Sequence, residues 1–235
     1  MKEQIMRIGH QFEMQVLTRS SARDFSTGTY MPYKAAYRFA RRNQPPGWCA
    51  SNPCSWEMRE LLNNLRNLVR DARAKNSSLR SPNLSVFVAT DTPLDYQHGV
   101  DCFIEWTEVV NGSRTAFYIT IDLTRNAEKR AGAGLINISQ KADFILSEQD
   151  LTPVGLTHIA RLMLRLLIDR RQLFFGRPDW AVSVRYAFAR FGHSAEEAEK
   201  YVDRVRLCGP INLEHHSTLR RAMVSGRNAV GTRVA

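Results

Sequence analysis

An Asn-Gly pair near the middle of the chain limits the fold more than any other feature. Asn111-Gly112 separates two runs rich in β-branched and aromatic residues, 100–110 and 115–124. Asn-Gly suits the positive φ angles of a two-residue hairpin turn. We therefore predict an antiparallel hairpin here, preceded by a further strand that begins at Leu84.

The length of this turn decides which residues face each other. With a two-residue loop, Val110 pairs with Ser113, and counting along both strands brings Asp101 opposite Asp122. Opposed side chains share one face of the sheet, with Cβ atoms about 4.5–5.5 Å apart. A four-residue loop keeps the aspartates on one face, whereas a three-residue loop separates them. The other face is apolar and is expected to form the core: Val100, Cys102, Ile104, Trp106, Phe117, Ile119 and Ile121.

Two neighbouring carboxylates repel each other unless a cation, a proton or an arginine lies between them. Mg²⁺ binds one or two carboxylates and keeps several waters, so Asp101 and Asp122 are candidate metal ligands. A purely structural interpretation stays open, in which both aspartates lie on a solvated sheet face and are neutralised by Arg114 or Lys129.

Three short motifs around this hairpin, in this order, resemble those of the PD-(D/E)XK nuclease superfamily. Gly9–Glu13 (GHQFE) resembles the helical GxxFE element, Asp95–Asp101 (DYQHGVD) the acidic loop ending in Gly-hydrophobic-Asp, and Ile121–Thr124 (IDLT) the last hairpin strand. Each motif is weak alone, and their order gives them weight. The resemblance covers roughly residues 1–20 and 84–146.

The resemblance implies a restriction-endonuclease-like fold and Mg²⁺-dependent phosphodiester hydrolysis. It assigns Asp101 and Asp122 as metal ligands and Glu13 as a third acid that can complete the metal's shell. Members of the superfamily end the last strand with Asp/Glu-x-Lys, whose lysine helps to activate water. Thr124 stands at that position here and cannot supply the charge. Two lysines of the following segment can take its place, Lys129, which we favour, and Lys141.

We expect an α/β protein with a mixed central sheet flanked by helices. Residues 1–173 would form the restriction-endonuclease-like core, with a basic aromatic insertion at 19–55, and residues 174–235 a helical extension with a basic tail. A further strand over 141–146 would extend the sheet. Apolar residues at helical spacing predict helices over 2–18, 56–75, 152–173 and 195–207.

The net charge of +10, from 33 Lys and Arg against 23 Asp and Glu, favours binding to polyanions. Basic residues alternate with aromatic ones in the insertion, a pattern suited to phosphate contacts and base stacking, so DNA or RNA is the expected partner. An equally weighted alternative is a helix around residues 32–42 that packs on the domain. The predicted nucleic-acid-binding residues are Arg19, Arg23, Tyr33, Lys34, Tyr37, Arg38, Arg41 and Arg42.

Other features limit the function classes. No apolar run is long enough to span a membrane and no secretion signal is present, while four cysteines are few for a disulfide scaffold, so we expect a cytoplasmic protein without membrane contact. Two alternatives to a nuclease stay open. One is a catalytically inactive relative that binds nucleic acid or assembles with proteins, including copies of itself; the other is an accessory factor whose arginines meet an acidic protein. A small, arginine-rich chain of this kind would suit a phage or mobile element.

Overall fold

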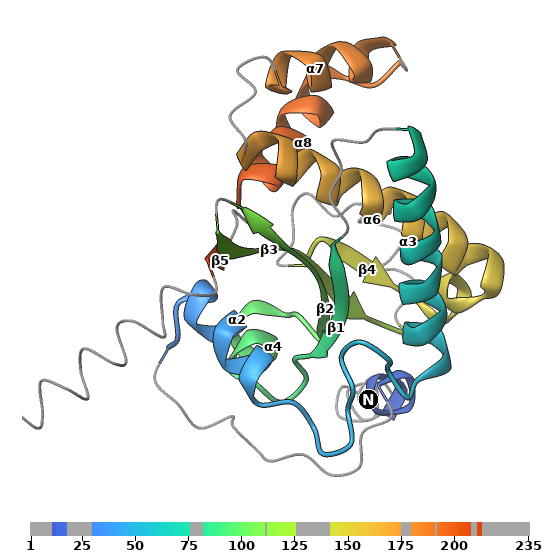
Figure 1. The fold of residues 1–235 in the computed structure, drawn as a ribbon, viewed down its shortest axis with the longest axis vertical. Helices are drawn as coiled ribbons and strands as arrows, with labels where there is room; N and C mark the ends of the chain where they lie inside the picture. Colours follow the sequence, from blue (N-terminus) through green and yellow to red (C-terminus); the bar gives the residue numbers. More distant parts are fainter. Residues whose placement is uncertain are drawn as a thin grey trace, which may run out of the picture.

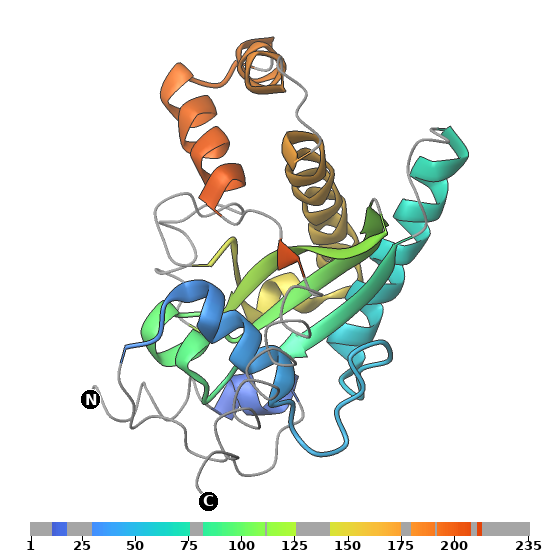
Figure 2. The same cartoon turned by 60° about the vertical axis from the view of Figure 1, so that its left-hand side comes forward.

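Helices pack on both faces of a mixed β-sheet (Figures 1 and 2), which confirms the predicted α/β architecture. The computed structural model describes residues 11–17, 30–75, 82–110, 112–125, 142–174, 180–190, 192–207 and 211–212. A helical segment at residues 11–16 comes first. The elements that follow are α2 (Tyr33–Arg42), α3 (Trp56–Lys75), β1 (Asn83–Val88), α4 (Pro93–His98), β2 (Cys102–Val110), β3 (Ser113–Leu123), β4 (Phe144–Leu146), η1 (Glu148–Leu151), α6 (Pro153–Phe174), α7 (Trp180–Arg190), α8 (Ala195–Leu207) and β5 (Ile211–Asn212).

The hairpin of β2 and β3 has the predicted two-residue register. Val110 lies opposite Ser113, and the ladder continues to Cys102 opposite Ile121. Gly112 has a φ of +80°, a conformation that glycine adopts without the steric penalty of a Cβ atom. The turn residues thus set the pairing of the whole hairpin.

The sheet is mixed because β4 runs parallel to β3. The strand order is β1, β2, β3, β4, and the first three strands are antiparallel neighbours. β4 pairs with residues 121–123 of β3, while β5 pairs with residues 115 and 116 farther along the same edge. Residues 144–146 form a shorter strand than the one predicted over 141–146.

Both faces of the sheet are buried. The expected core face packs with α3, α6 and segment 11–16 in the larger apolar cluster. Val100 belongs instead to the second cluster, on the other face, because it precedes β2 and does not follow the strand's alternation. That second cluster places Phe103 and Tyr118 of the sheet against Tyr37 of α2. The face that carries the aspartates is therefore not a solvated one.

The free edge of β1 is covered by the loop between α2 and α3. Ala50 O accepts from Val86 N at 2.8 Å, and the Gln44 side chain bonds both N and O of Val88, each at 2.9 Å. The Trp48 indole donates to Val86 O at 2.9 Å. These bonds satisfy groups that would otherwise offer an edge for another strand.

A buried ion pair joins α6 to the sheet. Arg170 donates to both carboxylate oxygens of Asp143, at 2.7 and 3.0 Å, and to the carbonyl oxygen of Tyr118. Asp143 also accepts from Thr120 N at 2.8 Å and from its hydroxyl at 3.0 Å. Both charged side chains are almost fully buried, so the pair acts as an internal clamp between α6, β3 and the start of β4.

The helices α7 and α8 project at one end of the molecule (Figures 1 and 2) yet share the larger apolar cluster with α6. Their contribution comes from Trp180, Val184, Tyr201, Val202 and Val205. None of the described helices combines the length and apolar composition needed to cross a bilayer.

Candidate functional site

Asp101 is held rigidly just before β2. Its amide donates to Ile121 O at 2.9 Å, and its carbonyl oxygen accepts from Ala89 N and Thr90 N at 2.7 and 3.0 Å. Its carboxylate oxygen Oδ2 accepts from Leu123 N at 2.5 Å. The residue is 4% exposed, so its carboxyl group has a defined position at the margin of the sheet.

Asp122 lies on β3 between the two residues that bind Asp101. The register of paired residues ends at Cys102 opposite Ile121, one residue before Asp101 would pair with Asp122. Asp101 still bonds both neighbours of Asp122, through its amide to Ile121 O and through its carboxylate from Leu123 N. Asp122 is half-buried and faces Ile145 of β4 in the register.

Further carboxylates act on Asp101. Burial raises the pKa of Asp101 well above its ordinary value, and the charges of Glu13, Asp95 and Asp122 raise it further, in that order, against the hydrogen bond from Leu123 N, which lowers it. Glu13 comes from the helical segment 11–16, whose Phe12, Val16 and Leu17 are buried in the larger core. Packing of that segment therefore brings a distant carboxylate within electrostatic range of the hairpin.

Asp95 is a residue that the sequence reasoning did not select as a ligand. Its segment, taken as an acidic loop, is the helix α4, which Thr92 caps by accepting from Leu94 N at 3.2 Å. Thr-Pro at the N-cap and first helical position is the signal that predicts this helix. Asp95 Oδ2 accepts from the amide of Asp91 at 2.9 Å. The backbone of Asp91 has a φ of +57°, which is uncommon for a residue other than glycine.

Carboxylate oxygens suit a hard cation such as Mg²⁺ or Mn²⁺, so the chemistry of the donor set fits. Within the described ranges, however, no three His, Cys, Asp or Glu side chains are already gathered around one metal position. Mg²⁺ needs only one or two protein carboxylates and completes its shell with water, so two of these carboxylates would be sufficient to hold it.

Thr124 is buried and donates its amide to Leu146 O at 2.8 Å. It stands where the resembled motif has a lysine, and its neutral hydroxyl supplies no positive charge. Lys129 lies outside the described residues. Arg114 lies at the far end of β3, roughly 27 Å along the strand from Asp122 at the usual rise per residue. Arg125, which the sequence reasoning did not select, places its guanidinium carbon 5.2 Å from the centre of the Phe12 ring, beside Glu13 in the chain.

Some of the predicted nucleic-acid-binding residues make contacts inside the fold, and others lie on its surface. Tyr37 is fully buried and donates to Glu105 Oε2 at 2.5 Å, while Arg41 donates to both oxygens of Glu105, at 2.7 and 3.1 Å. Burial, followed by Glu105, raises the pKa of Tyr37 well above its usual value. Both residues are thus occupied inside the fold, as the packed-helix alternative expects. Tyr33 is half-buried, with its ring centre 5.1 Å from that of His98, and Arg19 and Arg23 lie outside the described residues.

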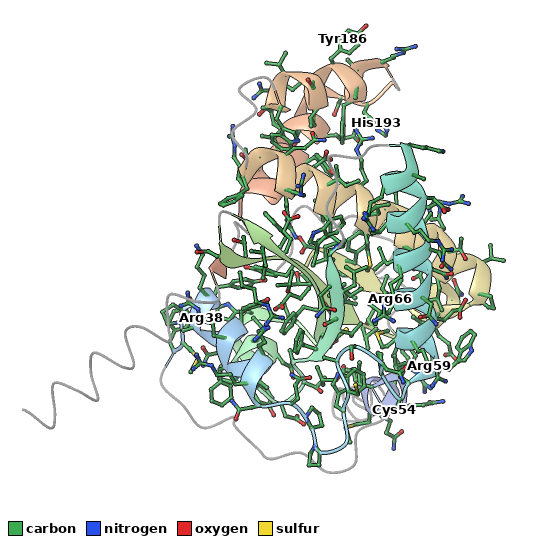
Figure 3. All side chains as sticks on the ribbon, viewed as in Figure 1. Arg38, Cys54, Arg59, Arg66, Tyr186 and His193 are labelled. Carbon is green, nitrogen blue, oxygen red and sulfur yellow. The ribbon has the colours of Figure 1, made fainter. Side chains whose placement is uncertain are left out.

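Three basic residues remain on the outer side of α2. Lys34, Arg38 and Arg42 recur every four residues, about 6 Å apart along the helix axis. Within the part of the chain that the structure describes, they form no ion pair. Figure 3 shows Arg38 on the side of the molecule opposite to Arg59 and Arg66 of α3. We call Lys34, Arg38 and Arg42 the basic row of α2.

The raised pKa of Asp101 predicts a pH-dependent stability. The folded protein keeps the Asp101 proton to higher pH than the unfolded chain, so the stabilisation is complete below the unfolded pKa of about 3.9 and is lost as pH rises through the folded pKa. Asp101→Asn keeps an acceptor for Leu123 N but removes the buried charge, so it should raise Tm at about pH 8 in metal-free buffer. Each kcal/mol gained in the free energy of unfolding should raise Tm by about 2–4 °C. The two proteins should converge near pH 4.

Thermal unfolding followed by circular dichroism across this pH range measures the effect. Asp71→Asn, at an exposed position of α3, is the matched control and should change stability by less than about 0.5 kcal/mol. A difference between Asp101→Asn and the parent protein that stays constant with pH would contradict the assignment.

Comparison of the chain with protein-family models, with curated proteins and with solved structures finds no match.

Proposed function

We propose that this protein binds nucleic acid and hydrolyses phosphodiester bonds with a divalent metal ion held by Asp101, Asp122 and Glu13. The observation that carries the proposal is the convergence of the charges of Glu13, Asp95 and Asp122 on the buried Asp101 carboxyl group. Such a cluster is costly unless a proton or a cation compensates it. A bound cation would favour the ionised form of Asp101.

The order of the strands supports a restriction-endonuclease-like core. An antiparallel β1-β2-β3 meander is followed by β4 parallel to β3, a mixed sheet like the one that the resemblance implies. Asp101 precedes β2 and Asp122 lies near the end of β3, the positions that correspond to the two acidic motifs. The helical segment carrying Glu13 packs on the same core.

A bound Mg²⁺ would activate a water molecule and neutralise charge on the phosphate. The protein's own part is to hold the carboxylates. Asp101 is fixed by backbone bonds to β3 and to the residues after β1, and Asp95 is oriented by the Asp91 amide. Arg125 and Lys129 are the candidates for the positive charge that Thr124 lacks.

The basic row of α2 lies close to this cluster in the fold. Met31 lies just before α2. Its carbonyl oxygen accepts from His98 Nε2 at 2.9 Å, and its amide donates to Gln97 Oε1 at 2.7 Å. Gln97 and His98 belong to α4, the helix that carries Asp95. A phosphate backbone that follows α2 would thus be led toward the carboxylates.

Removal of the basic row tests the binding surface. Lys34→Gln, Arg38→Gln and Arg42→Gln together should weaken binding to DNA or RNA by about tenfold or more, and should lower the slope of log affinity against log salt by about 2–3, because each phosphate contact contributes about 0.7–0.9. Fluorescence anisotropy over a salt series measures both quantities.

The matched control removes the same number of charges from α3, with Arg59→Gln, Arg70→Gln and Lys75→Gln. These residues are exposed on α3, which packs on the face of the sheet opposite to the one that α2 covers. Equal loss of affinity in both triple variants would mean that net charge alone attracts the nucleic acid and that α2 is not the contact surface.

A catalytically inactive module is the second candidate. It is favoured by the buried Thr124 at the motif-lysine position and by the lack, among described residues, of three ligands already grouped around a metal. Incubation with labelled single- and double-stranded DNA and RNA, with Mg²⁺ or Mn²⁺, separates the candidates. Cleavage supports the nuclease, and binding without cleavage supports the inactive module. If the protein neither cleaves nor binds nucleic acid, the result supports an accessory protein with an acidic protein partner.

A further inference from the structure

A cavity of about 190 Å³ lies between α6, α7 and α8. These helices lie at the opposite end of the molecule from α4 (Figures 1 and 2), so the cavity is separate from the acidic cluster. A cavity of about 150 Å³ is sufficient to hold a benzene ring. The space is therefore suited to a ligand the size of one or two small rings.

The walls of the cavity suit a flat ligand. Leu162 of α6 and Val184, Ala187 and Phe188 of α7 provide apolar surface. The rings of Phe188 and Tyr201 lie with their centres 5.3 Å apart. Aromatic walls of this kind favour a planar partner that can stack on them or meet their edges.

One strong acceptor lines this apolar space. Asp169 is 4% exposed, and its Oδ2 accepts from the Tyr201 hydroxyl at 2.6 Å and from Arg165 Nε at 3.3 Å. Burial and the Asp169 charge raise the pKa of Tyr201, so its hydroxyl stays a donor. No described residue donates to Asp169 Oδ1. Asp169 lines the cavity, so a ligand there can donate a hydrogen bond to Oδ1, and carboxylate oxygens are strong acceptors.

The charges around the cavity nearly cancel. Among the residues that line the cavity, Arg165, with a side chain 67% exposed, offsets Asp169, and Glu197, 3.7 Å from His193, is not part of the lining. Figure 3 shows His193 below α7, whereas Tyr186 on the same helix points away from the body. A neutral ligand fits this balance better than a strongly charged one.

We propose that this cavity binds a small, neutral, planar heterocycle of nucleobase size, which donates a ring or exocyclic N–H to Asp169 Oδ1 and packs against Phe188 and Tyr201. The site is independent of the acidic cluster and of the proposed nuclease activity. Such a site would let the protein bind a free base, or an unpaired base of a nucleic acid, at a second position.

Ligand-observed NMR with the full chain tests the proposal, using adenine, cytosine and uracil as probes and 1,3-dimethyluracil as an analogue of uracil without an N–H donor. At least one of the three bases should bind, and if uracil binds, the dimethyl analogue should bind about tenfold or more weakly, because a hydrogen bond to a charged group is lost. Failure of all three bases to bind the parent protein would overturn the proposal.

Two variants locate the site. Ala187→Phe fills the cavity without removing a polar contact and should abolish binding, and Asp169→Asn should weaken it about tenfold or more. Asp203→Asn, at an exposed position of α8, is the control and should bind like the parent. Circular dichroism checks that each variant is folded. Binding that survives in folded Ala187→Phe, or that is unchanged in Asp169→Asn, would overturn the proposal.

Discussion

Asp101→Asn combined with Asp122→Asn is expected to lower metal-dependent cleavage of nucleic acid by about 10³-fold or more. Loss of both charged ligands removes several kcal/mol of transition-state stabilisation by the metal, and each 1.36 kcal/mol is a factor of about ten in rate. The measurement is single-turnover cleavage of a labelled substrate at saturating Mg²⁺. Asp71→Asn should cleave like the parent protein.

The stability of the same variant separates lost chemistry from lost structure. Asn is nearly isosteric with Asp and can still accept from Leu123 N, and removing a buried carboxylate from a set of carboxylates should stabilise the fold at neutral pH. The expected combination is therefore a higher Tm with less cleavage. Cleavage that persists in a folded double variant would contradict the role of these residues, and any remaining activity would have to come from another site.

Arg170→Met is expected to destabilise the fold by about 3–5 kcal/mol, the usual cost of leaving a buried charge without its partner. Asp143, 0% exposed, would lose both bonds from Arg170 and keep those from Thr120. At about 2–4 °C per kcal/mol for a chain of this size, Tm should fall by roughly 10 °C. Thermal and urea unfolding measure the change.

Neutralising the remaining partner provides the internal check. Adding Asp143→Asn to Arg170→Met keeps an acceptor for Thr120 N while removing the charge, so part of the lost stability should return. Arg161→Met, on the same helix but at an exposed position, should change stability by less than about 0.5 kcal/mol. Equal losses of stability from Arg170→Met and Arg161→Met would contradict a large contribution of the buried pair.

The local parts of this fold can be predicted from the amino-acid sequence. Asn111-Gly112 sets a two-residue turn, and through it the register of β2 and β3. Side-chain caps mark where the long helices begin, because Ser55, Thr152 and Ser194 each accept from a backbone amide of the first turn. Such signals depend on neighbours within a few residues, so they are readable without knowledge of the fold.

Which helix or loop covers each face of the sheet depends on long-range packing. Alternation along β2 and β3 indicates which residues share a face, yet it does not reveal that α2 buries the more polar face and occupies Tyr37 and Arg41 with Glu105. The contacts that join Glu13 and Asp95 to Asp101, and Arg170 to Asp143, span distant parts of the chain. Packing of helices against a sheet sets these contacts, and no local pattern of residues encodes it.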